Sequence, residues 1–134
     1  MDPNDQKLIC PDSAASYYSD WGFSPAIECR GFIFVSGCTG TMDNGTVPEG
    51  ITAQTRQAFS RIKISLDEAG VNFSDIVEMT TYHVGLNSHL DKFIAVKNEF
   101  ISEPYPAWTA IGVTELASEG AIVEIKIIAK SKIT

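Results

Sequence analysis

Short stretches with the two-residue alternation of β-strands recur along the chain. Residues 26–29 and 32–37 are rich in β-branched and aromatic side chains and flank Arg30-Gly31, which predicts a hairpin with a tight turn. The same enrichment predicts three further strands, at residues 75–84, 108–113 and 121–129.

Two other segments have apolar residues three, four and seven positions apart, the spacing of amphipathic helices. The first runs from Ile51 to Ala69, and Gly70 follows it as a helix stop. The second is predicted to begin at Ser88, an N-cap with Asp91 three residues later, and to end before the next proline.

The resulting order, ββαβαββ, predicts an α+β fold: a two-layer sandwich with both helices on one face of a mixed sheet. We expect a single domain over residues 1–134, because no repeat or low-complexity linker divides the chain. Residues 1–21 hold two of the prolines among scattered Asp, Ser and Asn, and are expected to form an irregular N-terminal arm.

The last predicted strand has two different sides. One set of alternate residues is entirely apolar and is expected to face the helices. On the other side, Ile122 and Ile128 alternate with Glu124 and Lys126. That surface is too apolar for simple exposure and too charged for a dry core, so we expect a subunit interface with polar pockets.

The composition of the chain excludes several classes of binding partner. The 17 acidic and 10 basic residues give a formal net charge of −7, and no run of Lys or Arg could follow a phosphate backbone, so no nucleic-acid partner is expected. No apolar stretch approaches the roughly 20 residues of a membrane-spanning helix, and the first residues are acidic where a signal peptide would be basic. We expect a cytoplasmic protein with no membrane association.

The cysteines and histidines match no known metal-binding or nucleophile motif. Cys10, Cys29 and Cys38 share no Cys-x-x-Cys spacing, so we expect reduced thiols and no metal. His83 and His89 are not spaced as a metal pair and are expected to be core or rim residues rather than catalytic ones. Cys38 follows a strand end and could face a cleft, but the sequence reveals no base to activate its thiol.

Two residues are stronger candidates for a site. Glu124 lies in an otherwise apolar strand, where a carboxylate must be paired, hydrogen-bonded or protonated, and a raised pKa would suit a general acid or base. An ion pair with Lys126, or with an arginine of another subunit, explains Glu124 equally well. The indole of Trp108 could offer a stacking face beside a polar pocket or belong to the core.

A series of short motifs occurs in a fixed order: GFSPAI (22–27), GFIFVSG (31–37), QTRQAF (54–59), LDEAG (66–70), DIV (75–77), PAWTAIGV (106–113) and IVEI (122–125). Over a family core of residues 22–130, this series resembles the RidA (YjgF) family. The resemblance implies a chorismate-mutase-like subunit and a homotrimer with a cleft between each pair of subunits. It also implies an enamine/imine deaminase, a metabolite-repair hydrolase that converts reactive imino acids to keto acids and ammonia without a cofactor.

In active members of the family, an arginine in a Pro-x-Arg-Ser/Thr motif binds the substrate carboxylate, and a glutamate on the last strand helps position the attacking water. Carried over by position, the glutamate matches Glu124 and a strand-end glycine matches Gly37, beside Cys38. Trp108 holds the place of the arginine. The remaining positions of the family's cleft match Phe23, Ile94 and Ala110.

Loss of a buried arginine contact would cost of order 2–5 kcal/mol of substrate binding, so we expect weak or absent deamination of the usual 2-imino acids. Two functions remain open. The first is a diverged deaminase in which Glu124 positions water, with a small ligand that has a flat or hydrophobic body. The second is a non-catalytic trimer that binds a small ligand, with Trp108 as a stacking wall. The ribonuclease activity attached to relatives of this family is not expected of so acidic a chain.

Overall fold

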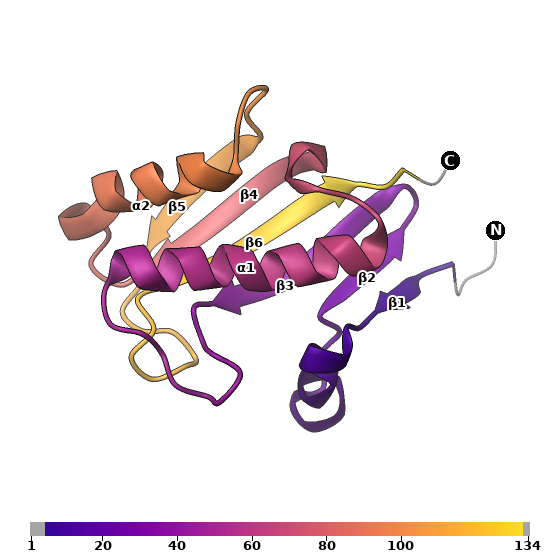
Figure 1. Ribbon diagram of the computed structural model, residues 1–134, viewed down its shortest axis with the longest axis horizontal. Helices are drawn as coiled ribbons and strands as arrows, with labels where there is room; N and C mark the ends of the chain where they lie inside the picture. The colour runs from indigo at the N-terminus through magenta and orange to yellow at the C-terminus, as the bar shows by residue number, and fades with distance from the viewer. Residues whose placement is uncertain (1–4, 133–134) are drawn as a thin grey trace.

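The computed structural model describes residues 5–132, which form a six-stranded sheet with both long helices on one of its faces (Figure 1). Residues 1–4 of the predicted arm lie outside the described residues. The strands are β1 (Lys7–Ile9), β2 (Ala26–Cys29), β3 (Phe32–Thr39), β4 (Ile76–His83), β5 (Ala107–Gly112) and β6 (Val123–Lys130). The helices are α1 (Ile51–Ala69) and α2 (Leu86–Phe100), with short helical turns η1 (Asp12–Ala14), η2 (Tyr17–Trp21) and η3 (Phe73–Asp75).

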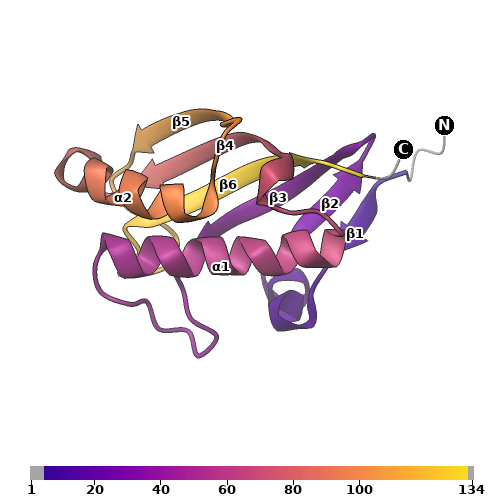
Figure 2. The same ribbon diagram turned by 45° about the horizontal axis from the view of Figure 1, so that its top comes forward.

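The sheet has the order β1-β2-β3-β6-β4-β5, in which only β4 and β5 run parallel. Parallel neighbours need a crossover, and α2 supplies it on the same face as α1 (Figure 2). The predicted α+β sandwich with a mixed sheet and two helices on one face is therefore confirmed. No helix within residues 5–132 is both long and apolar enough to cross a membrane.

The prediction of an irregular arm is wrong for part of its length. Residues Lys7–Ile9 form β1, which pairs antiparallel with β2 and buries Ile9 opposite Ala26. The observed order therefore has one strand more than predicted. Three residues are too few to display an alternation in the sequence, whereas in the fold they cover the edge that β2 would otherwise expose.

The start of the second helix also differs from the prediction. The N-cap is Gly85, which adopts a left-handed conformation with φ 76°, and the helix begins at Leu86. Ser88 lies within the first turn, where its hydroxyl donates to the Gly85 carbonyl. A glycine at this position lets the chain reverse immediately after β4. The predicted hairpin turn is confirmed, because Arg30 and Gly31 both have positive φ, as a type I′ turn requires.

The core lies between the helices and the sheet. All five residues of the predicted helix-facing set are buried, which confirms the alternation: Ala121, just before β6, and Val123, Ile125, Ile127 and Ala129 within it. Helix α1 places Phe59 and Ile62 against this face, and α2 adds Phe93. Burial of these apolar side chains is the main stabilising contribution to the two-layer arrangement.

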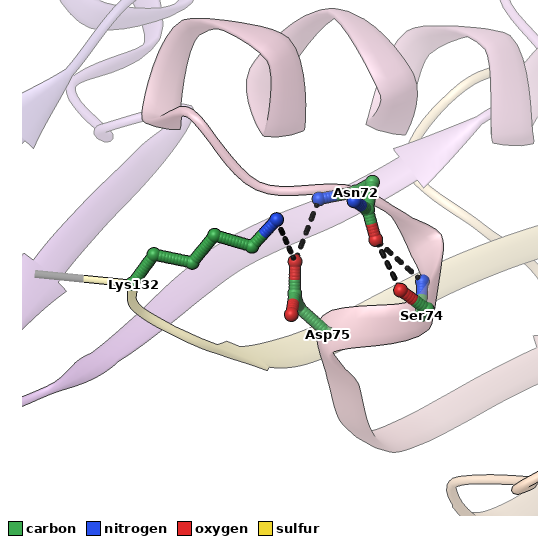
Figure 3. A network of polar contacts seen from close by, with 4 residues as sticks. All are labelled: Asn72, Ser74, Asp75 and Lys132. Atoms are coloured by element: carbon green, nitrogen blue, oxygen red, sulfur yellow. Dashed lines mark hydrogen bonds and ion pairs between the residues drawn. The ribbon is translucent and has the colours of Figure 1, made fainter.

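A polar network fixes the turn between α1 and β4 (Figure 3). The carboxamide oxygen of Asn72 accepts hydrogen bonds from the backbone N–H and the hydroxyl of Ser74. Asp75 accepts from the backbone N–H of Asn72 at 3.0 Å, which completes a capping box. Lys132 forms an ion pair with Asp75 at 3.4 Å, so the segment after β6 is held beside the start of β4.

The face of the sheet opposite the helices carries an apolar row. Leu8, Ile27, Phe34 and Ile128 lie directly opposite one another on β1, β2, β3 and β6. Leu8 and Phe34 are 44% and 39% exposed. The apolar part of the surface expected from the last strand therefore extends across four strands.

Gly40, which directly follows β3, allows α1 to approach the sheet closely. A methyl group at this position would lie 2.5 Å from the carbonyl oxygen of Gln54 and 2.6 Å from its Cα. Because these atoms are backbone, we predict that Gly40→Ala lowers the free energy of unfolding by about 1–3 kcal/mol in urea titrations. Gly112→Ala is the matched control: its methyl group would meet Leu86 no closer than 3.8 Å. Equal stability of the two variants would contradict the close approach.

Candidate functional site

A cleft opens between the N-terminal arm, the end of β3 and the loops at residues 41–47 and 117–119. It has two overlapping lobes with volumes of about 660 and 310 Å³. The smaller lobe, named here the Glu124 cleft, has walls formed by Tyr17, Phe23, Gly37, Arg61 and Glu124.

A bulge in β3 creates this opening. Val35 pairs with Ile127 and Cys38 pairs with Ile125, so β3 holds one residue more than β6 over this stretch. Strand β2 begins at Ala26, opposite Val35, and leaves the rest of β3 without a neighbour on that side. The chain before β2 is nevertheless fixed there, because the backbone N–H of Ser36 donates to the Pro25 carbonyl at 2.9 Å.

The absence of a side chain at Gly37 makes room for Glu124. A Cβ atom at this position would collide with the Glu124 carboxylate. Gly37 was singled out in the sequence only through the family resemblance, and the structure supplies a steric reason for the glycine. Any larger residue would displace the carboxylate or the bulge.

Glu124 is half-buried, and within residues 5–132 its carboxylate forms neither a hydrogen bond nor an ion pair. Burial raises the pKa of its carboxyl, and the positive charge of Arg61 partly offsets that rise. The alternative ion pair with Lys126 does not form in this chain. Glu124 therefore presents a free carboxylate to the cleft.

Cys38 is buried next to the bulge and lines the larger lobe. Desolvation raises the pKa of its thiol to about 11; the charge of Arg61 opposes the rise and that of Glu124 adds to it. Since the thiolate is the nucleophile, this raised pKa disfavours Cys38 as a nucleophile at neutral pH.

Trp108 and Ala110 lie on the opposite face of the sheet from Glu124. They sit beside Met79 and Thr81 in the register of β4 and β5, on the helix-covered face. Glu124 lies opposite Tyr82, whose side chain points to the other face. Ile94 is on α2, packed against the core. One chain thus brings together Glu124, Gly37, Cys38 and Phe23, and separates them from Trp108, Ile94 and Ala110.

The indole of Trp108 is held by its neighbours. Its Nε1–H donates to Thr81 at 3.0 Å, and its ring packs against Phe93 with 5.7 Å between centroids. The ammonium of Lys97 lies 5.1 Å from the ring centroid, within cation–π range. Trp108 therefore has no free hydrogen-bond donor to offer a ligand.

The two histidines are buried and hydrogen-bonded, as predicted. His83 Nδ1 lies 3.1 Å from His89 Nε2, and His83 Nε2 lies 2.7 Å from the Thr81 hydroxyl. Burial, with a smaller contribution from His89, lowers the pKa of His83 to about 4. Among residues 5–132, no group of three or more His, Cys, Asp or Glu side chains could hold a metal ion.

Arg61 is a cleft residue that the sequence reading missed. Its Nη1 donates to the Thr39 carbonyl at 2.7 Å, and its guanidinium lies 5.2 Å from the centroid of the Tyr17 ring. On α1 it lies off the apolar stripe, where a charged residue is normally solvated. The available signal was a polar row of Gln54, Arg61 and Ser65, spaced seven and four residues apart beside the apolar stripe.

Comparison with known proteins now settles the family. Residues 14–131 match the family model described as Endoribonuclease L-PSP. The chain is 37% identical over 127 residues to the RutC family protein YjgH of Escherichia coli (strain K12), covering 94% of this chain and 95% of that protein. The chain belongs to the RidA/YjgF family.

Other relatives agree with this assignment. A solved structure of protein YJGH superposes with a TM-score of 0.87 at 35% identity, covering 97% of this chain and 99% of that one. A 2-iminobutanoate/2-iminopropanoate deaminase of Dermatophagoides farinae is 30% identical over 106 residues, 78% of this chain and 81% of that protein. The family resemblance read from the sequence is confirmed, and one of the relatives is named an imine deaminase.

The cysteines provide one test of the cleft's chemistry. We predict that at about pH 8 a disulfide reagent modifies Cys10 and Cys29, which are partly exposed, much faster than Cys38, whose thiol is buried and protonated. Absorbance of the released thiolate measures the reaction. Cys38→Ser should remove only the slow phase; loss of a fast phase in that variant would contradict this assignment.

The buried histidine pair predicts the direction of acid destabilisation. The folded-state pKa of His83 lies below its unfolded value of 6.5, so the unfolded chain binds more protons as the pH falls. The contribution to stability is complete above about pH 6.5 and is lost as the pH falls toward 4, by at most about 3 kcal/mol. NMR titration should place one histidine near 4, and two histidines that titrate near 6.5 would refute the prediction.

Proposed function

We propose that this chain is a cofactor-independent hydrolase of small imine or enamine metabolites, a diverged deaminase of the metabolite-repair type that acts in the cytoplasm. The observation that carries the proposal is the free, half-buried carboxylate of Glu124 inside a cleft. Membership of a family that includes a named imine deaminase supports the reaction class.

Glu124 would serve as the general base and then the general acid. As water attacks the C=N carbon, the carboxylate accepts a proton from that water and a C–O bond forms. The carboxyl then returns the proton to nitrogen, which gives a carbinolamine. In a second exchange, the carboxylate accepts the proton of the new hydroxyl as the C=O bond forms and passes it to nitrogen as the C–N bond breaks, so ammonia and a carbonyl product are released. The raised pKa of Glu124 suits this exchange, because burial makes the carboxylate a stronger base than an ordinary glutamate.

We further propose that the complete cleft lies between subunits of a homotrimer. Within one chain, the sheet separates Trp108, Ile94 and Ala110 from Glu124, so these groups could share a cleft only if they came from neighbouring copies. The apolar row Leu8, Ile27, Phe34 and Ile128 supports assembly, because a single chain leaves it uncovered.

Trp108 supports a second candidate, a trimer that binds a small ligand without turnover. It occupies the position of the family's arginine, and its indole N–H is already bound to Thr81. A ligand would therefore meet an apolar ring there. Quenching of tryptophan fluorescence without consumption of the ligand would favour this function, with Trp108→Phe as the control for the signal of Trp21.

The hydrolase is tested with Glu124→Gln. Imino acids generated in situ by an amino-acid oxidase should release ammonia faster with the wild-type protein than with buffer, and the substitution should slow this by at least about 100-fold. Glu119→Gln, at the exposed rim of the larger lobe, is the matched control and should retain activity. If wild-type protein accelerates ammonia release no more than buffer does, the deaminase is ruled out.

Stability measurements separate lost chemistry from lost structure in the same variant. Because the folded-state pKa of Glu124 is raised, this carboxyl holds its proton more tightly in the folded chain than in the unfolded chain, and its own contribution to stability falls as the pH rises above about 4.3. Glu124→Gln removes this penalty. It should therefore unfold at a higher temperature than wild type at neutral pH, with no gain at pH values below that range, and should keep the wild-type oligomeric state.

A further inference from the structure

Among the described residues that line the cleft, Arg61 is the one that carries a positive charge. Only its Nη1 is used, as a donor to the carbonyl and the hydroxyl of Thr39 at 2.7 and 3.4 Å. Its Nε and Nη2 groups have no hydrogen-bond acceptor within residues 5–132. Part of the planar donor array of the guanidinium is therefore free to bind a ligand.

The guanidinium is held in place before any ligand arrives. Thr39 binds it on one side, and the ring of Tyr17 lies 5.2 Å from its central carbon. Tyr17 in turn packs against Phe23 with 5.4 Å between ring centroids. A preorganised guanidinium loses less side-chain freedom on binding, which favours affinity.

Arg61 and Glu124 share the cleft without pairing. No ion pair joins them within the described residues, although the charge of Arg61 is close enough to affect the Glu124 carboxyl. Unpaired opposite charges on the walls of one small lobe leave room for a ligand that is anionic at one end. Without a cation, the carboxylate of Glu124 and the net charge of −7 would repel such a ligand.

We propose that Arg61, on α1, binds the carboxylate of the ligand in the Glu124 cleft. The free Nε and Nη2 edge provides the two parallel donors that match a carboxylate. Tyr17 and Phe23 provide the apolar wall. This assignment rests on the proposed function, and it supplies from α1 the anion contact that Trp108 cannot make from β5.

Lys97 is the competing cation. Its ammonium lies between the rings of Tyr105 and Trp108, 5.3 and 5.1 Å from their centroids, and it has no ion pair within residues 5–132. It is 8% exposed, and burial lowers its pKa. It does not line the cleft of its own chain, so Arg61 is the better-placed anion site.

The test compares a carboxylate with its uncharged amide. The dissociation constants of 2-oxobutanoate and 2-oxobutanamide are measured by NMR titration of the Trp21 indole N–H, a reporter at the cleft. Wild-type protein should prefer the acid by about 10-fold or more. Arg61→Gln should weaken binding of the acid by about 30-fold and of the amide by less than about 3-fold, because only the acid loses a charge-assisted contact.

Two variants sharpen the comparison. Arg56→Gln is the matched control on the same helix: Arg56 is exposed and pairs with Glu99, so both affinities should stay unchanged. Glu124→Gln should retain or strengthen the preference for the acid, because it removes a negative charge from the cleft. Retained preference together with lost turnover would separate binding from catalysis.

Other results of these titrations would contradict the proposal. Equal affinity for acid and amide in wild type and Arg61→Gln would overturn the role of Arg61 while leaving a ligand-binding cleft. If Arg61→Gln weakened binding of the acid and the amide equally, Arg61 would have a structural role and its assignment as the carboxylate contact would be overturned. The assignment would also be overturned if Lys97→Met, and not Arg61→Gln, abolished the preference for the acid. Absence of binding by either ligand, with no imine turnover, would overturn both this assignment and the proposed function.

Discussion

The register of β6 is the constraint on which the fold and the cleft both depend. This strand lies between β3 and β4, and its alternation places Val123, Ile125, Ile127 and Ala129 beneath the helices and Glu124 on the other side. A slip of one residue would bury Glu124 and Lys126 and expose the apolar set. The bulge at Ser36 and Gly37 accommodates the register at the position where Glu124 needs space. Burial of the apolar side of β6 in the core therefore determines the position of the Glu124 carboxylate.

The cleft retains features that reduce stability. A carboxylate whose pKa is raised by desolvation is less stable in the folded chain than in water, and an arginine with unsatisfied donors contributes less than a paired one. Neighbouring structure holds these groups apart: Thr39 and Tyr17 fix Arg61, and the absence of a side chain at Gly37 accommodates Glu124. Such unpaired opposite charges are expected where ligand binding, rather than folding, satisfies them.

Local sequence patterns predicted most of the helices and strands, but they could not predict contacts between residues far apart in sequence. The periodicities of α1 and β6 are long enough to be read directly, but β1 is too short to show one. Glu124 was found because a carboxylate is conspicuous in an apolar strand. Arg61 was missed because its position in the cleft depends on contacts with Thr39 and Tyr17, which are 22 and 44 residues away in sequence. The spacing of residues along a helix does not reveal such distant contacts.

The tryptophan at position 108 fits the groups that surround it. Its neighbours are the ammonium of Lys97, 5.1 Å from the ring centroid, and Thr81, which also contacts the buried His83. A guanidinium at position 108 would stand beside that ammonium in a partly desolvated site, where like charges repel strongly. An indole instead attracts the ammonium through its ring and donates its N–H to Thr81. With Lys97 in place, an aromatic residue is therefore favoured at 108 over a second cation.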